Sequence, residues 1–135
     1  DGKLTPELIK PRLHNFGVCH HSQPKAVYIS QVSELGTIYT IEEVKAIADL
    51  LHAHGMYLHM DGARLANACA YLNCSMKELT VDAGVDILSF GGTKNGMMMG
   101  ITIVWCMKVV IVMMNDGVKV FRMIWMAMLI LKVNG

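Results

Sequence analysis

The sequence predicts an α/β domain in which a parallel sheet carries crossover helices. Three short apolar runs, at 26–30, 56–60 and 85–90, are rich in β-branched and aromatic residues and predict strands. The segment between the first two, 40–55, has apolar residues at helical spacing. Strands that alternate with helices imply parallel pairing through right-handed crossovers. A chain of 135 residues suits one such domain.

Local signals at the helix ends support this order of elements. Thr5 is a candidate N-cap with Pro6 at the first helical position, and Pro11 should bend or end that first helix. Thr40 and Glu43 have the spacing of a capping box, so a helix is expected to begin at 41.

Two further helices are expected between the second and third strands. The first, at about 64–72, is rich in Ala and Leu. The second is a short helix at 76–79, because Ser75 and Glu78 form another capping box.

Composition narrows the function classes. A net charge of +1 gives no electrostatic reason to expect nucleic acid or an anionic membrane as partner. The first ten residues are polar and do not resemble a signal peptide, and the four cysteines contain no CxxC pair. We therefore expect a cytoplasmic protein with free thiols.

Two charged residues follow predicted strands and are candidates for chemistry. Ligands of parallel sheets bind at the carboxyl ends of the strands, where Asp61 and Lys94 are expected to lie. A partly desolvated lysine there can form a Schiff base, and Gly91, Gly92 and Gly96 would let the backbone turn beside a bulky ligand. The alternative is a surface lysine in a glycine turn, which spacing alone favours.

Asp61 and Arg64 each have two interpretations. The Asp61 carboxylate can pair with a protonated ring nitrogen, or it can cap the following helix, which is the commoner role at such a position. Arg64, three residues later, can present its planar fork to a phenolate or carboxylate, or it can be an exposed helix arginine.

The residues give little support to two other kinds of site. The stretch GGTKNG differs from a phosphate-binding P-loop, because Thr93 precedes the lysine and Asn95 follows it. A metal site has little support, because no two of the candidate ligands have finger or HExxH spacing. Those ligands are Cys19, His20, His21, His52, His54 and His59.

The stretches LHMDGARLANA (58–68) and DILSFGGTKNG (86–96) together closely resemble the low-specificity L-threonine aldolases. These enzymes belong to the β-eliminating lyases, which depend on pyridoxal 5′-phosphate and have the aspartate-aminotransferase-like fold. The resemblance runs from about residue 3 to residue 100, and KLTPELIKPRL, SQVSELGTIYT and CSMKELT fit the same family segment.

The resemblance implies a role for each candidate residue. Lys94 matches the lysine that binds pyridoxal phosphate covalently, Asp61 the aspartate that pairs with the pyridine nitrogen, and Arg64 the arginine near the ring oxygen and substrate carboxylate. The implied reaction cleaves L-threonine or L-allo-threonine to glycine and an aldehyde. The implied parent protein is a homo-oligomer, of which this chain is part of the large domain.

Some features of the family are not found in the sequence. No glycine-rich phosphate cradle or small C-terminal domain is recognised, so we expect this chain by itself to be incomplete and inactive. The alternatives are a non-enzymatic remnant that binds no cofactor, and a related pyridoxal-phosphate lyase with another amino-acid substrate.

The family-like composition ends near residue 100. Nine of the 12 methionines lie at 97–135, where four basic residues accompany one acid, Asp116. We therefore divide the chain into a family-like part, 1–100, and an atypical tail, 101–135. One hypothesis for the tail is a shifted reading frame. The run 97–114 approaches the length of a membrane span, but Lys108 near its middle would be costly there, so buried or aggregation-prone strands are preferred.

Overall fold

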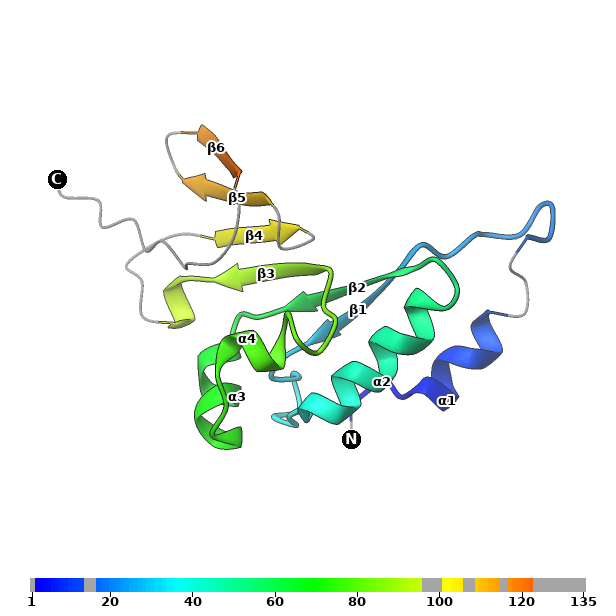
Figure 1. Cartoon of the computed structure of the whole chain (residues 1–135), viewed down its shortest axis with the longest axis horizontal. Helices are drawn as coiled ribbons and strands as arrows, with labels where there is room; N and C mark the ends of the chain where they lie inside the picture. The colour runs from blue at the N-terminus through cyan, green and yellow to red at the C-terminus, as the bar shows by residue number, and fades with distance from the viewer. Residues whose placement is uncertain (1, 14–16, 96–100, 106–108, 115–116, 123–135) are drawn as a thin grey trace, which may run out of the picture.

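The computed structural model describes residues 2–13, 17–95, 101–105, 109–114 and 117–122, with side chains described up to Asn95. A six-stranded sheet runs through the molecule in the order β1-β2-β3-β4-β5-β6 (Figure 1). The first three strands pair in parallel and the last three antiparallel. Their bounds are β1 Ala26–Ser30, β2 Tyr57–Asp61, β3 Ile87–Gly91, β4 Ile101–Trp105, β5 Val109–Met114 and β6 Gly117–Arg122.

The helices begin where the capping residues predict. In α2 (Ile41–His52) and α4 (Met76–Leu79) both hydrogen bonds of the capping box are present, formed by Thr40 with Glu43 and by Ser75 with Glu78. These reciprocal bonds satisfy backbone N–H groups that have no partner within the helix. The remaining α-helix of this region, α3, spans Leu65–Leu72.

The first α-helix is short, with four residues. Helix α1 covers Pro6–Ile9 and continues as the 3-10 turn η1 at Lys10–Arg12, which contains Pro11. Thr5 occupies the N-cap position, but its side chain makes no capping hydrogen bond. The predicted effect of Pro11 is confirmed, because the α-helix ends at Ile9, two residues before the proline.

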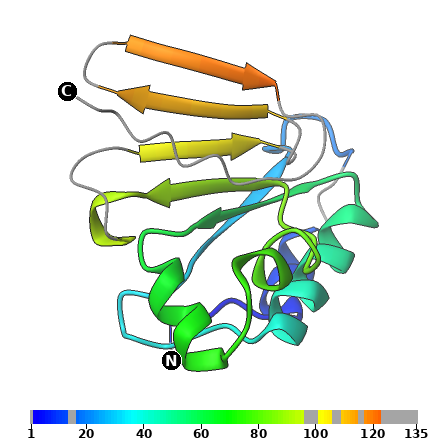
Figure 2. The ribbon, with the colours of Figure 1, turned by 60° about the vertical axis from the view of Figure 1, so that its left-hand side comes forward.

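The α-helices lie on one face of the sheet, as Figures 1 and 2 show. Alternate residues of the parallel strands are buried on that face with α2, in a cluster that includes Val44, Ile47 and Leu51. The buried strand residues are Ile29, Leu58, Met60, Leu88 and Phe90. Successive strand residues point to opposite faces, so the polar residues between these apolar ones share the other face.

The parallel sheet is confirmed for β1, β2 and β3, and the direction changes at β4. Only residues 92–100 separate β3 from β4, and a parallel crossover needs about a dozen residues or more. For the run 97–114 the sequence favours strands over a membrane span, and these strands correspond to β4 and β5. Strand β6 has no counterpart among the predicted elements. Whether these strands are buried depends on side chains outside the described part of the chain.

Candidate functional site

The candidate site lies at the carboxyl ends of the three parallel strands. Ser30, Asp61 and Ser89 are register partners on β1, β2 and β3, and so form one row across the sheet. The chain leaves β2 through the turn at 62–64 that leads into α3, and it leaves β3 through the 3-10 turn η2 (Thr93–Asn95). The row therefore lies between two turns that carry the charged residues singled out in the sequence.

Both carboxylate oxygens of Asp61 are hydrogen-bonded. Oδ1 accepts the backbone N–H of Ala63 at 2.8 Å, and Oδ2 accepts the phenol of Tyr28 at 2.7 Å. The N-cap position of α3 is occupied by Arg64, so the alternative role of Asp61 as that helix's N-cap is wrong. Asp61 instead orders the turn before the helix, and its carboxylate stays at the end of β2.

Tyr28 and His59 form a polar cluster with Asp61 on the same face of the sheet. Their rings meet edge to face, with centroids 5.2 Å apart, and His59 Nε2 lies 2.8 Å from the hydroxyl of Ser89. Burial lowers the pKa of His59, and the Asp61 charge partly offsets that change. Burial raises the pKa of Tyr28, and the hydrogen bond and charge of Asp61 raise it further.

The sequence alone indicates no role for Tyr28 or Ser89, and it presents His59 only as a candidate metal ligand. Strand alternation contains part of the signal, because His59 is two residues before Asp61 and must share its face. Tyr28 could be placed beside them only once the register of β1 against β2 was known.

Arg64 lies beside the carboxylate of Glu34, a neighbour that the sequence alone does not identify. Its Nη1 lies 3.5 Å from Oε1 of Glu34, and the two side chains are 35% and 83% exposed. Within the described residues no hydrogen bond or ion pair joins Arg64 to Asp61. The structure thus brings the two residues to the same turn without joining their charged groups.

Lys94 lies in η2, just past the end of β3, which is the position that the sequence predicts. Its side chain is exposed, so the expected partial desolvation is not found in the described part of the chain. Its ammonium has no hydrogen bond or ion pair to any residue that the structure describes.

Asn95 joins the turn of Lys94 to the turn after Asp61. Its Nδ2 lies 3.1 Å from the carbonyl oxygens of both Gly62 and Ala63 and 2.7 Å from that of Gly91. Its Oδ1 accepts the N–H of Ala66 at 3.0 Å. The sequence alone does not predict these contacts, because Asn95 is 33 residues from Gly62 and 29 residues from Ala66.

Two glycines allow the end of β3 to approach this turn closely. A Cβ on Gly91 would lie 3.0 Å from the Cα of Ala63, and a Cβ on Gly62 would lie 2.9 Å from Cδ1 of Leu88. The space that a side chain would need is thus filled by neighbouring atoms. Glycine is needed at position 91 because a side chain would not fit between the end of β3 and the turn after β2. Its greater backbone freedom is not the reason.

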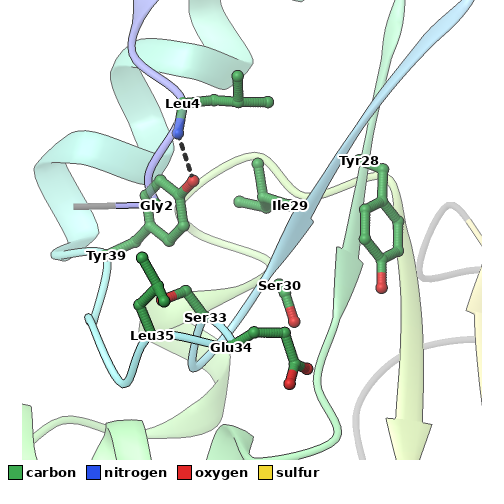
Figure 3. Close-up of a pocket in the computed structure, with 9 residues that line it drawn as sticks. All are labelled: Gly2, Leu4, Tyr28, Ile29, Ser30, Ser33, Glu34, Leu35 and Tyr39. Carbon is green, nitrogen blue, oxygen red and sulfur yellow. Dashed lines mark hydrogen bonds between the residues drawn. The ribbon is translucent and has the colours of Figure 1, made fainter.

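A shallow pocket of about 260 Å³ opens beside the row, between β1 and the N-terminal segment (Figure 3). Leu4, Ile29, Leu35 and Tyr39 supply apolar surface, and Ser30 and Glu34 supply oxygen atoms. The hydroxyl of Tyr39 accepts the N–H of Leu4 at 2.7 Å and so anchors the N-terminal segment there. The ion pair of Glu34 with Arg64 connects this pocket to the turn after β2.

The described residues contain neither a cluster of metal ligands nor a helix that could span a membrane. No three His, Cys, Asp or Glu side chains among them gather closely enough to hold a metal ion. No helix among them is both long enough and apolar enough to cross a bilayer.

Comparisons with known proteins find similar sequences and a similar fold among threonine aldolases. Over 99 residues the chain is 50% identical to the low specificity L-threonine aldolase of Pseudomonas aeruginosa, an alignment that covers 73% of this chain and 29% of that protein. The low specificity L-threonine aldolase of a Pseudomonas species is 48% identical with the same coverage. The chain thus spans about 29% of the length of the curated relatives it matches.

A solved structure, the threonine aldolase of Leishmania major, aligns with a TM-score of 0.70 and 37% identity, over 78% of this chain and 31% of that one. This likeness identifies the fold as part of an α/β domain of the kind found in the pyridoxal-phosphate transferases. The sequence profile of the β-eliminating lyases matches residues 1–115. The chain therefore belongs to the β-eliminating lyase family.

Proposed function

We propose that these residues form the cofactor-binding edge of a pyridoxal-phosphate-dependent lyase of the threonine aldolase type. Its substrates are β-hydroxy amino acids such as L-threonine and L-allo-threonine, which are cleaved to glycine and an aldehyde. The observation that carries the proposal is the placement of two groups on segments joined by Asn95. They are the hydrogen-bonded carboxylate of Asp61, at the end of β2, and the amine of Lys94, which has no partner among the described residues.

The side chains present fit the chemistry of this cofactor. An ionised carboxylate has about four lone-pair sites, and the described contacts of Asp61 use two of them, so it can accept another N–H. Lys94 has an exposed amine that can meet an aldehyde. The ion pair of Arg64 with Glu34 is long and exposed, so Arg64 can exchange it for another carboxylate.

Each residue then has a role in the proposed reaction. Asp61 holds a proton on the ring nitrogen by charge pairing, Lys94 supplies the amine that attaches the cofactor, and Arg64 orients the substrate carboxylate with its planar fork. Bound pyridoxal phosphate supplies a conjugated ring that takes up the negative charge left at Cα when the Cα–Cβ bond breaks.

The proposal extends to the protein of which this chain is a part. Because the alignments cover less than a third of the relatives, we propose that the chain by itself is inactive. The family resemblance implies in addition that the full-length parent is a homo-oligomer. We also propose a cytoplasmic location, which the free thiols of Cys19, Cys69 and Cys74 support.

The change of composition near residue 100 supports the division into a family-like part and an atypical tail, with a shifted reading frame as one origin of that tail.

Trapping of the cofactor tests the site. The chain is incubated with pyridoxal phosphate and reduced with borohydride, and modified lysines are quantified by mass spectrometry. We expect Lys94 to carry most of the label, and Lys94→Ala to lose it. The matched control is Lys45→Ala, which removes an exposed lysine of α2 and should leave labelling of Lys94 unchanged.

Labelling spread evenly over the lysines, and unaltered in Lys94→Ala, would contradict the proposed site and support a non-enzymatic remnant. The substrate class needs a separate assay on the full-length parent with a panel of β-hydroxy amino acids. If none of them released glycine, the parent would be a lyase with another substrate.

A further inference from the structure

The side chain of Asn95 is bonded at both ends of its amide. Nδ2 points to the three carbonyl oxygens of Gly62, Ala63 and Gly91, and Oδ1 accepts the N–H of Ala66. Only this orientation places a donor against carbonyl oxygens and an acceptor against the N–H group. A flipped amide would lose every one of these bonds, so the side chain has a single satisfied arrangement.

Asn95 also replaces a missing local cap on α3. Arg64 occupies the N-cap position and makes no side-chain capping bond. Ala66 is the second residue of the helix, and its N–H has no partner within the helix. Asn95 supplies that partner from 29 residues further along the chain. The start of α3 therefore depends on a residue of η2.

The same amide connects the candidate residues. Asp61 lies one residue before Gly62, Arg64 one residue after Ala63, and Lys94 one residue before Asn95. We propose that Asn95 is a positioning residue of the site, which holds the Lys94 amine in a constant place relative to Asp61 by clamping η2 onto the turn at 62–66. The inference rests on the proposed function, because it concerns the geometry that Lys94 needs to meet the cofactor aldehyde.

An ordinary structural amide would stabilise the fold without affecting the reactivity of Lys94. The two cases differ in the ratio of label on Lys94 to label on Lys45 in the trapping experiment, measured well below the unfolding temperature. A loss of global stability leaves that ratio unchanged while the chain stays folded. A loss of position at η2 lowers it.

The variants separate the two ends of the amide. Asn95→Ala removes all of its bonds, whereas Asn95→Asp keeps an acceptor for Ala66 and places an oxygen against the three carbonyls. Asn67→Ala is the matched control, because Asn67 is exposed on α3 and its side chain has no partner within the described residues. Val44→Ala destabilises the core of α2 at a distance from η2 and controls for stability alone.

Hydrogen exchange of the Ala66 amide gives a readout that requires no cofactor. We expect roughly tenfold faster exchange or more in Asn95→Ala, and little change in Asn95→Asp. The ratio of label on Lys94 to label on Lys45 should fall several-fold in both Asn95 variants. It should stay at the wild-type value in Asn67→Ala and Val44→Ala.

The outcomes distinguish this inference from the proposed function. Selective labelling of Lys94 in the wild type that persists in both Asn95 variants overturns the inference and leaves the function standing. An equal fall in Val44→Ala overturns it as well, since stability alone would then explain the loss. Unselective labelling of the wild type contradicts the proposed function, and the role of Asn95 toward the cofactor is rejected with it.

Discussion

The phenol of Tyr28 donates a 2.7 Å hydrogen bond to Oδ2 of Asp61, diagonally across β1 and β2. Asp61 pairs in register with Ser30, so Tyr28 reaches toward the strand end from two residues upstream. His59, the register partner of Tyr28, contacts its ring edge to face. One carboxylate therefore acts on the pKa values of both rings, in addition to the larger effect of their burial.

Replacing Asp61 with Asn should lower the pKa values of both His59 and Tyr28. The negative charge of Asp61 raises both, because it stabilises the imidazolium and disfavours the phenolate. NMR titration of the His59 ring and absorbance titration of tyrosine would measure the changes. Asp49→Asn, which alters an exposed carboxylate of α2, should leave both pKa values in place. Unchanged values in Asp61→Asn would show that the carboxylate does not act on this cluster.

Gly91→Ala should destabilise the fold by about 1–3 kcal/mol, because the new methyl group would meet the backbone and side chain of Ala63. Urea unfolding followed by circular dichroism would give the free energy of unfolding. The double variant Gly91→Ala/Ala63→Gly removes the contact with Cβ of residue 63 and should recover part of the loss. A Gly91→Ala protein as stable as the wild type would mean that the turns separate at little cost.

The stability of the fold should fall at acid pH partly through Glu43. Burial raises the pKa of this carboxyl, but hydrogen bonds from Lys3 and the Thr40 N–H outweigh it, so the folded pKa lies below the usual 4.5. A carboxyl with a lowered folded pKa contributes stability above its unfolded pKa. That contribution is lost as the pH falls from about 4.5 through the folded value.

Urea unfolding of Glu43→Gln across this pH range should show a weaker pH dependence than the wild type. Lys3→Met should weaken it as well, because the Lys3 ammonium is the main group that lowers the pKa. The two substitutions should not add, since they remove one interaction. A pH dependence identical to the wild type in Glu43→Gln would exclude this carboxyl as its source.

Glu34→Gln should change the free energy of unfolding by less than about 1 kcal/mol. Its pair with Arg64 is 3.5 Å long and the Glu34 side chain is 83% exposed, so solvent and salt screen the attraction. Thermal unfolding at low and high salt would test this. A larger loss that disappears at high salt would show that Arg64 is held firmly by Glu34, which would weaken its proposed role toward substrate.

The local elements of this protein follow from its sequence. The capping boxes of Thr40 with Glu43 and of Ser75 with Glu78 join residues three apart, so their pattern is visible in the chain itself. The short apolar runs likewise predict the three strands, and their alternation with helices predicts parallel pairing. Asp61 and Lys94 lie at or just past the strand ends. These features depend on residues within one turn or one strand of each other, so the spacing of residues in the sequence is sufficient to predict them.

The contacts that organise the candidate site were decided only by the tertiary structure. Tyr28 is 33 residues from Asp61, and Asn95 is 29 residues from Ala66. Such pairs depend on strand register and on how closely two turns approach. No repeating pattern in the sequence predicts either property. The pairing of Arg64 with Glu34 arises in the same way. The sequence determined which residues stand at the strand ends, and the packing of the turns decided which of them are bonded to one another.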